Sequence, residues 1–488
     1  MTNRCHAENS LAVTVTRGRL DLRPPLLVIL VLCATCVPSC KEINPLYCSG
    51  TYDGTRCITD APLASGSDSD SDSGSEDGSD SGRPACTTDE ECHVGVCDIA
   101  VSHQCVQCTP AEPGSCTGAT PVCSADNVCR GCRLDDECAS SEVCDATGGS
   151  CLAEATVLYV SPTGTGTLCT QAQPCGQLAT ALGLVAGDKK TIKILPGSYT
   201  ERVTMTNLAV AIHGQGADLS EASTGEVIRI AGSATIDLFG LRIHDGLGSS
   251  GDGILCINDA EKSPVITLEN VAIDHNSGHG INATKCSLSV NGSTLSTNAA
   301  GAISTSGGSL TISRTNVSGN QGGGISAING SFDITNTFIT RNGDSSVSAV
   351  GGASLASAAG SVNRFEFNTV ADNLVKNGGF LSGGVACDIA GFAASNNIIA
   401  HNFINNDATQ ANANTNGLCV YPTSTVAASL TGLNFASPSN IPYDYHLLPG
   451  SSAIDAATTP SMIHVDGDGN VRPQGAANDQ GADEVVQP

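Results

Sequence analysis

Two pairs of neighbouring residues, His244-Asp245 and Asp274-His275, carry the side chains of this sequence best suited to chemistry. They lie 30 residues apart, with the order of the two residue types reversed. If the chain returns to the same position after 30 residues, His244 lies beside Asp274 and Asp245 lies beside His275. Crossed pairs of this kind transfer protons near neutral pH or bind a metal ion. Outward turns of a solvated fold also collect such residues. That interpretation is favoured, so the four remain candidates and no catalytic residue is assigned.

An acidic run near the C-terminus, Asp466-Gly-Asp468-Gly-Asn470, has the alternating carboxylates that converge on Ca²⁺ in calcium-binding loops. The sixth and twelfth positions of this run lack the Gly and Glu of an EF-hand, so that site is excluded. We interpret the run as a turn in which Asp455 or Asp479 pairs with Arg472. No metal site and no cofactor are predicted, and Ca²⁺ remains the alternative. Signature sequences of serine hydrolases, zinc peptidases and nucleotide-binding loops are absent from the sequence.

Twelve cysteines between residues 86 and 151 form three groups of four, whose starts are 22 and 24 residues apart. Each unit has too few apolar residues to fold without covalent cross-links. Two CxxC spacings, Cys105 to Cys108 and Cys129 to Cys132, match a four-cysteine zinc ribbon. Repetition of the whole group and the signs of export given below favour disulfides over zinc, and the connectivity stays open. The twelve are Cys86, Cys92, Cys97, Cys105, Cys108, Cys116, Cys123, Cys129, Cys132, Cys138, Cys144 and Cys151.

The first 40 residues have the organisation of a secretory signal. Arg17, Arg19 and Arg23 precede the apolar run 26–37, which is too short to span a bilayer. The run ends in Val-Pro-Ser-Cys, which is similar to a bacterial lipobox, so we expect a lipid on Cys40. Ordinary signal-peptidase cleavage is the alternative. The protein is therefore expected to be an outer-membrane or cell-surface lipoprotein or, without the lipid, a secreted protein.

Residues 41–64 form a short cysteine-containing segment, and an acidic stretch follows at 65–84. The stretch is rich in Ser and Asp and cannot offset the entropy of ordering, so it is predicted to be a disordered linker. The triplicated module occupies 85–152. The net charge of −26 disfavours contact with nucleic acid and anionic membranes, so membrane contact is expected only through the lipid anchor.

A fixed period of 22 residues between 266 and 349 identifies the elements that position the remaining candidates. Apolar residues return at each step, in short alternating runs separated by Gly, Asn and Ser, which predicts several short strands for each repeat. The expected fold is an all-β, right-handed parallel β-helix solenoid with 22-residue coils. The apolar columns are Ile266, Leu288, Leu310 and Phe332; Leu268, Val290, Ile312 and Ile334; Ile273, Leu295, Val317 and Ile339; and Ile281, Ile303, Ile325 and Val347. A further column, Asn276, Asn298, Asn320 and Asn342, is predicted to form a structural asparagine ladder.

Longer coils extend this pattern on both sides, so the solenoid is assigned to 153–442 and a C-terminal cap to 443–488. Two cysteine pairs, Cys256 with Cys286 and Cys387 with Cys419, are placed to join neighbouring coils, and Cys169 with Cys175 to close a small loop. Residues 174–186 predict an amphipathic helix that covers the first coil. Matches to the columns continue at Ile236, Leu238, Ile243, Phe365, Val370, Asn373, Phe392, Ile399 and Asn402.

Several segments resemble known families. The segments 159–164, 174–178 and 192–201 (YVSPTG, PCGQL and IKILPGSYTE) resemble the opening of right-handed β-helix proteins of the pectate-lyase-like fold. The C-terminal segments 445–455, 466–473 and 479–484 are similar to the terminal region of bacterial surface proteins called choice-of-anchor Q proteins. The resemblance implies a fold and an exported location, and it does not imply a reaction.

The same resemblance raises two classes of function. Members of the wider fold cleave acidic polysaccharides with carboxylates that hold Ca²⁺ and a Lys or Arg that removes a proton. No such set matches here residue by residue, and Lys262, Lys285, Arg314, Arg341 and Arg364 share no column. We therefore favour a surface protein that presents a β-helix binding face to a polysaccharide or another surface protein. An extracellular polysaccharide lyase or hydrolase is the alternative.

Overall fold

The computed structural model describes residues 51–52, 57–58 and 85–486, without 94, 112–114, 146, 222, 259–261, 345–347, 349, 377–381 and 406–412. The chain divides into two units, Met1–Asp68 and Ser69–Pro488. In the first, strand β1 (Thr51–Tyr52) pairs antiparallel with β2 (Cys57–Ile58). The predicted signal segment, Cys40 and the 65–84 linker lie outside the described residues. In the described part of the chain, no helix has the length and apolarity needed to cross a membrane.

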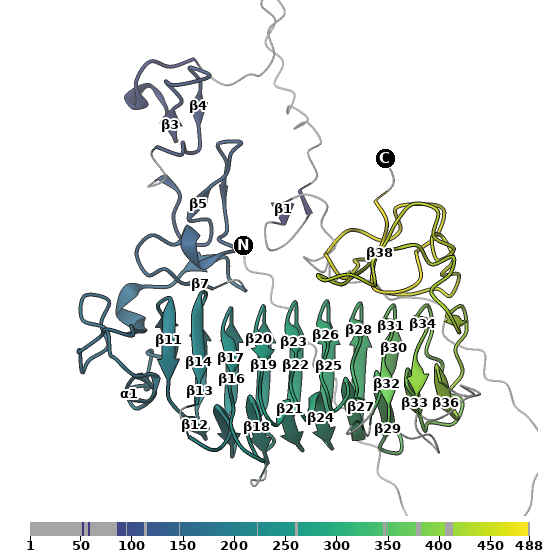
Figure 1. Ribbon diagram of the computed structural model, residues 1–488. Coiled ribbons are helices and arrows are strands. Elements are labelled where there is room, and N and C mark those ends of the chain that lie inside the picture. The colour runs from purple at the N-terminus through teal and green to yellow at the C-terminus, as the bar shows by residue number, and fades with distance from the viewer. Residues whose placement is uncertain are drawn as a thin grey trace, which may run out of the picture. The chain divides into compact units, whose positions relative to one another are not determined.

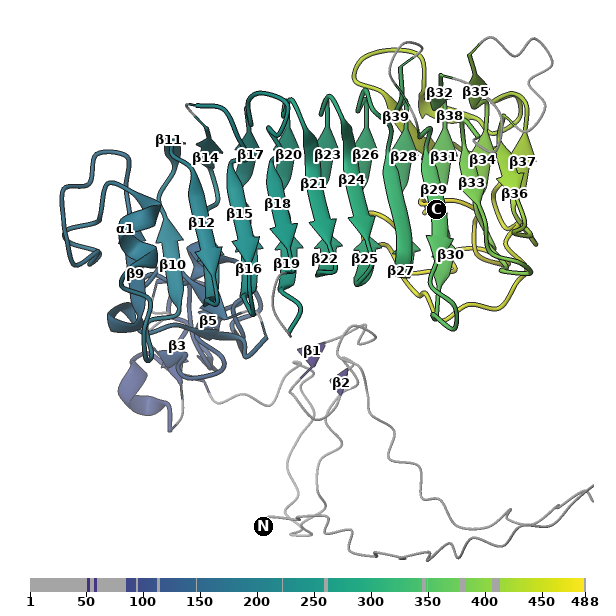
Figure 2. The same cartoon turned by 90° about the horizontal axis from the view of Figure 1, so that it is seen from below.

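The main body of the second unit is a parallel β-helix, as the 22-residue period predicts (Figures 1 and 2). Three parallel sheets run along it, and each strand pairs with the equivalent strand of the next coil. Sheet 1 contains β9 (Val157–Val160), β10 (Thr191–Ile194), β13 (Ala209–His213), β16 (Thr235–Phe239), β19 (Val265–Glu269), β22 (Ser287–Asn291), β25 (Ser309–Ser313), β27 (Ile325–Thr335) and β30 (Arg364–Glu366). Sheet 2 contains β11 (Gly197–Thr200), β14 (Ala217–Ser220), β17 (Arg242–His244), β20 (Ala272–Asp274), β23 (Thr294–Ser296), β26 (Asn316–Ser318), β28 (Phe338–Thr340), β31 (Thr369–Ala371), β34 (Ile398–Ala400) and β37 (Thr425–Ala427). Sheet 3 contains β12 (Val203–Thr206), β15 (Ile228–Ala231), β18 (Ile254–Ile257), β21 (His279–Thr284), β24 (Gly301–Ser306), the first part of β27, β29 (Ala353–Ser357), β33 (Val385–Cys387) and β36 (Thr415–Gly417).

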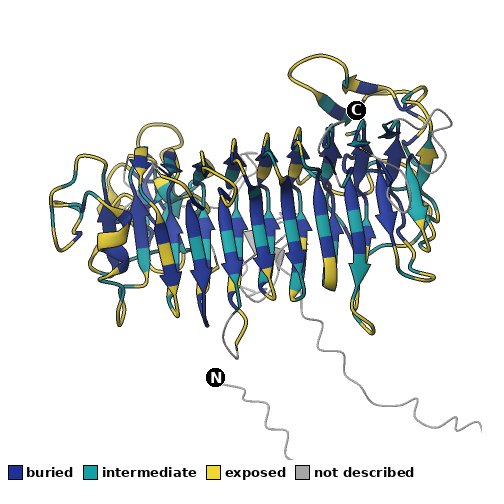
Figure 3. Ribbon diagram, turned by 60° about the horizontal axis from the view of Figure 1, so that its bottom comes forward, coloured by how far each residue is buried: buried dark blue, intermediate teal, exposed yellow. Residues whose placement is uncertain are grey.

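The strand register confirms the first three predicted apolar columns. Ile266 pairs with Leu288 and Leu288 with Leu310, and all three are buried. Buried and exposed bands consequently alternate along the strands (Figure 3). The fourth column is wrong after Ile325, whose partner is Ala353 and not Val347. An insertion lengthens this coil, and Val347 itself lies outside the described residues.

The asparagine column lies buried at the corner where sheet 2 turns into sheet 3. Each side-chain amide donates from Nδ2 to Oδ1 of the next coil, at 2.9 Å from Asn276 to Asn298 and at 2.8 Å from Asn320 to Asn342. Because these buried amides are hydrogen-bonded, the ladder stabilises the stack of coils. It continues through Asn373 and Asn402, as their matches to the column predict, and then to Asn414. A short parallel pair, β32 (Leu374–Val375) with β35 (Phe403–Ile404), follows it.

A single turn of helix, α1 (Leu178–Leu182), covers the N-terminal end of the solenoid with Leu178 and Leu182 buried. The Glu201 carboxylate accepts hydrogen bonds from the backbone N–H groups of Leu178 and Ala179, at 2.7 and 3.1 Å. The predicted helix over 174–186 is therefore too long. Its first residues are extended instead, because Cys175 forms a parallel bridge with Val160.

The chain after β37 forms a cap that packs on sheet 2. Strands β38 (Phe435–Ser437) and β39 (Asp444–Leu447) form an antiparallel hairpin. Its Phe435 and Tyr445 share an apolar cluster with Ala371 and Ile398 of sheet 2. The cap thereby covers the outer face of sheet 2 at the last coils (Figure 1).

Arg472 is fully buried in the cap, and Glu484 is its carboxylate partner, with 2.8 Å between Nη1 and Oε2. The expectation that Asp455 or Asp479 pairs with Arg472 is wrong, because the guanidinium is directed to Glu484 and to the backbone carbonyls of Asp479 and Gly481. Asp479 accepts from the N–H groups of Asp455 and Val485. Its backbone carbonyl, not its carboxylate, accepts from Arg472.

The cysteine-rich module consists of three units, each with one short antiparallel hairpin. In every unit the first cysteine pairs with the third and the second with the fourth, which resolves the connectivity that spacing left open. The bonds are Cys86–Cys97, Cys92–Cys105, Cys108–Cys123, Cys116–Cys129, Cys132–Cys144 and Cys138–Cys151. The hairpins are β3 (Val96–Cys97) with β4 (Cys105–Val106), β5 (Val122–Cys123) with β6 (Cys129–Arg130), and β7 (Cys144–Asp145) with β8 (Ser150–Cys151); 3-10 turns lie at η2 (Asp89–Glu91), η4 (Asp135–Glu137) and η5 (Glu154–Thr156). The solenoid pairs Cys169–Cys175, Cys256–Cys286 and Cys387–Cys419 also form, as predicted.

Candidate functional site

The register places His244 opposite Asp274 on adjacent strands, but the crossed side-chain pairs do not form. Each histidine instead contacts the aspartate next to it in the sequence, with 2.9 Å from His244 Nδ1 to Asp245 Oδ2 and 2.6 Å from His275 Nδ1 to Asp274 Oδ1. Asp245 and His275 both have positive φ, near 55°, so the backbone turns their side chains away from the strand direction.

The Arg242 guanidinium explains why Asp274 is not available as an acid or base. Its Nε and Nη2 donate to the two oxygens of Asp274, at 2.9 and 2.6 Å. Burial alone would raise the pKa of Asp274, but the hydrogen bonds from Arg242 and His275 outweigh it and lower the pKa. The arrangement joins two coils and does not resemble a poised catalytic group.

The nearby Asp252 is also engaged. It accepts from the backbone N–H of His279 at 2.7 Å and from Asn282 Nδ2 at 3.1 Å, so it orders a turn.

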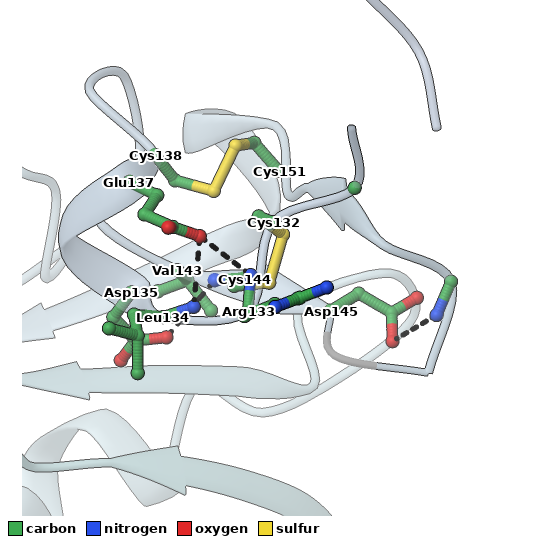
Figure 4. The surroundings of a disulfide bond; sticks show 12 residues. Cys132, Arg133, Leu134, Asp135, Glu137, Cys138, Val143, Cys144, Asp145 and Cys151 are labelled. Carbon is green, nitrogen blue, oxygen red and sulfur yellow. Dashed lines mark hydrogen bonds between the residues drawn. A yellow bond between two sulfur atoms is a disulfide. The ribbon is translucent and has the colours of Figure 1, made fainter. Parts of the chain in front are cut away.

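The third cystine unit, whose disulfides are drawn in Figure 4, is attached to the outer face of sheet 1 through Asp135. The Asp135 carboxylate accepts from Lys193 Nζ at 2.8 Å and lies 3.1 Å from His213 Nδ1. Burial favours protonation of Asp135, yet the hydrogen bonds and charges of His213 and Lys193 hold its pKa at about 2. The phenol of Tyr159 adds a second attachment by donating to the backbone carbonyl of Ser141 at 2.9 Å.

A groove of about 670 Å³ lies between this cystine unit and sheet 1, and we call it the cysteine-module groove. The His213 and Phe239 rings stack within it, with centroids 4.6 Å apart and planes 24° apart. Its polar lining combines carboxylates and amides from both sides: Asp145, Gln215, Asp237, Glu269 and Asn270. An aromatic surface bordered by a few hydrogen-bonding groups is the usual composition of a small-ligand site.

A second groove of about 350 Å³ lies between the cap and the outer face of sheet 2, and we call it the cap groove. Arg341 stacks over the Tyr443 ring at 3.7 Å from its centroid. Behind them, Asp372 accepts from the Tyr445 hydroxyl and lies 3.6 Å from Arg341. Ser296, Thr297 and Asn316 are part of the lining.

The arginines considered as proton acceptors for a lyase are held in structural contacts. Arg364 donates to both oxygens of Asp333, at 2.7 and 2.6 Å. Arg314 donates from Nε to Asn291 Oδ1 at 3.1 Å. Together with the stacked Arg341, these side chains do not converge on a cluster of acidic ligands.

Comparison with known proteins assigns no activity to this chain. No protein-family profile and no curated protein sequence matches this chain. Among solved structures it is similar to the pectate lyase Pel9A, with a TM-score of 0.48 and 17% sequence identity over 67% of this chain and 96% of that chain. The strand pairing by itself establishes a parallel β-helix fold. Because that fold supports unrelated functions, function must be argued from the grooves of this chain.

Sequence reasoning missed both grooves and the Asp135 contact. The repeat offered one partial signal, because Asp89 and Asp135 occupy equivalent positions in the first and third units. Both accept a backbone N–H from the hairpin of their own unit, that of Cys97 and that of Cys144. Nothing in that equivalence indicated that Asp135 also binds the solenoid.

Proposed function

We propose that this protein is an exported surface protein that binds a neutral or basic glycan in the cysteine-module groove. The Phe239 ring carries the proposal, because it is partly exposed in the groove, stacks on the buried His213 ring, and offers an apolar surface for the C–H face of a sugar ring. Asp237, Glu269 and Asn270 supply acceptors for the hydroxyl or amino groups at the edge of that ring.

The charge of the groove argues for this class of ligand over an acidic polysaccharide. Asp145, Asp237 and Glu269 line the groove, and the chain as a whole has a net charge of −26. Carboxylates of a uronic-acid polymer would be repelled there. Binding is therefore favoured over the alternative of a lyase that acts on uronic-acid polymers.

The disulfides support export. All eighteen cysteines between Cys86 and Cys419 are paired, and such bonds persist in oxidising compartments. Attachment through a lipid on Cys40, with residues 65–84 as a spacer, completes the proposal and would hold the groove away from the membrane.

Calorimetric titration of the mature protein with neutral, amino-sugar and uronic-acid oligosaccharides tests the proposal. Neutral or amino-sugar ligands should bind, and Phe239→Ala should weaken binding by about 10-fold or more. Tyr443→Ala, in the cap groove, is the matched control and should leave the affinity unchanged. The proposal is overturned if Phe239→Ala binds like the parent or if uronic-acid oligosaccharides alone bind. Release of unsaturated products from uronic-acid polymers, with or without Ca²⁺, would establish the lyase alternative instead.

A further inference from the structure

Three metal-ligating side chains of the cap converge from segments that are far apart in the sequence. His446 lies on β39, Asp468 in the turn 466–470, and Asp483 close to the end of the chain. One ligand atom of each lies within 4.8 Å of those of the other two. His446 Nε2 and Asp468 Oδ2 are 3.1 Å apart. Ligands that share one Zn²⁺ ion at about 2.1 Å are themselves about 3.0–3.4 Å apart, so this separation fits a common ion.

The imidazole of His446 is oriented as a ligand. Its Nδ1 lies 2.5 Å from Asp444 Oδ1, which favours the tautomer with the hydrogen on Nδ1 and the lone pair on Nε2. A carboxylate behind a histidine is the common outer contact of metal sites. Nε2 is buried and has no hydrogen-bond partner among the residues that the structure describes, although Asp468 Oδ2 lies 3.1 Å from it.

Asp483 contributes a buried charge. The residue is only 7% exposed, and its Oδ2 accepts one hydrogen bond, from the backbone N–H of Leu447 at 2.6 Å. A buried carboxylate with so few donors is costly, and a bound cation would remove that cost.

Asp466 in the same turn is different, since it accepts from the backbone N–H groups of Asp468, Asn470 and Glu484. It shapes the turn and leaves Asp468 as the ligand.

We propose that His446, Asp468 and Asp483 bind one divalent transition-metal ion, for which Zn²⁺ is the best match. One imidazole and two carboxylates suit Zn²⁺ and leave a coordination position for water. The ion joins β39, the 466–470 turn and the C-terminal segment, so it acts as a cross-link of the cap. The sequence has no cysteine after Cys419, so no disulfide can do this there. The competing interpretation requires no metal. In it, His446 is a protonated imidazolium that pairs with Asp468 and Asp483.

Metal titration of the mature protein, first freed of metal with a chelator, distinguishes the two. Zn²⁺ should bind with one ion per chain and, at 100-fold excess over Kd, should raise Tm by at least about 2 °C. Ca²⁺ and Mg²⁺ at the same concentration should not. Co²⁺ should give the visible absorption of an ion with nitrogen and oxygen ligands. Absence of Zn²⁺ uptake, or stabilisation by Ca²⁺ in place of Zn²⁺, overturns the proposal.

Variants then locate the ion. The Asp468 side chain is 54% exposed, so Asp468→Asn should fold, bind Zn²⁺ more than 100-fold more weakly and lose the rise in Tm. Asp444→Asn should weaken binding by about 10- to 100-fold by releasing the imidazole. Asp188→Asn, an exposed aspartate near α1, is the control and should keep the full rise. An unchanged affinity in Asp468→Asn refutes the site even if the protein takes up Zn²⁺.

Discussion

The carboxylate of Asp135 and the ammonium group of Lys193 are 2.8 Å apart, although the two residues belong to different modules. The contact fixes the third cystine unit on the outer face of sheet 1 and so forms one wall of the cysteine-module groove.

Asp135→Asn should loosen this attachment, because it removes the charge that Lys193 and His213 share. Lys193 is only 6% exposed, so leaving it unpaired should cost at least about 2 kcal/mol. The expected result is faster proteolysis between residues 152 and 157, measured under native conditions. The neighbouring Asp136 is exposed, and Asp136→Asn should leave the rate unchanged. Equal rates in the two variants would show that the contact contributes nothing.

The same attachment should depend on pH. The pKa of Asp135 is about 2 in the folded protein, below its ordinary value of 3.8. The lowered pKa means that attachment to sheet 1 favours the charged form of Asp135. The stabilisation by this contact is therefore complete above about pH 4 and is lost as pH falls toward 2. Pepsin cleavage at the 152–157 junction should therefore accelerate across this range in the parent protein. Asp135→Asn should lack that acceleration, and a step of equal size in the variant would contradict the assignment.

Ile312→Asp should disrupt the solenoid. Ile312 is fully buried in the column formed by Val290 and Ile334, and a charge there has no partner. A loss of more than about 4 kcal/mol is expected, seen as reduced far-UV dichroism or a much lower Tm. Thr311→Asp, one residue away on the exposed face, is the control and should change Tm little.

The four His/Asp candidates should separate into two classes. Asp274 is buried and clamped by Arg242, so Asp274→Asn should lower Tm measurably. Asp245→Asn and His275→Gln, whose side chains are 55% and 61% exposed, should each change stability by only about 0–1 kcal/mol. His244 is only 16% exposed and belongs with Asp274. Thermal melting with and without added Zn²⁺ tests this. A Zn²⁺-dependent rise in Tm that these substitutions abolish would restore a metal site on the solenoid.

A thiol reductant should destabilise the cysteine-rich module, and a zinc chelator should not. A thiol reductant should make residues 86–151 protease-sensitive, because disulfides replace an apolar core there. A zinc chelator should leave that module resistant, and peptide mapping should recover the first-to-third and second-to-fourth pairs. Chelator sensitivity of this segment would favour a zinc ribbon.

The solenoid was predictable because each coil repeats the same pattern of apolar residues. Ile266, Leu288 and Leu310 are equivalent in sequence, so their alignment in space follows from the period alone. The prediction stopped at Ile325, where an insertion changed the coil length and the next partner became Ala353. An insertion carries no periodic signal that would show where the strand resumes.

The contacts that build the grooves and the cap were not predictable by the same reasoning. Asp135 pairs with Lys193, which lies 58 residues further along the chain. Arg472 pairs with the carboxylate of Glu484, although Asp479 is closer to it in the sequence. Both pairings depend on where the folded backbone places each carboxylate, and the sequence alone does not give that geometry. The aligned positions of His244 and Asp274 were foreseen, but the left-handed backbone at Asp245 and His275 redirected the side-chain contacts.

The asparagine ladder also gives the solenoid a direction. Every Nδ2 donates toward the next coil, from Asn276 through to Asn414, whose own Nδ2 donates to the Ala427 carbonyl at 2.7 Å. The amide dipoles therefore point the same way, and each polarises the one that follows. Each amide therefore depends most on its immediate neighbours, and removing one should weaken the hydrogen bonds of the adjacent coils.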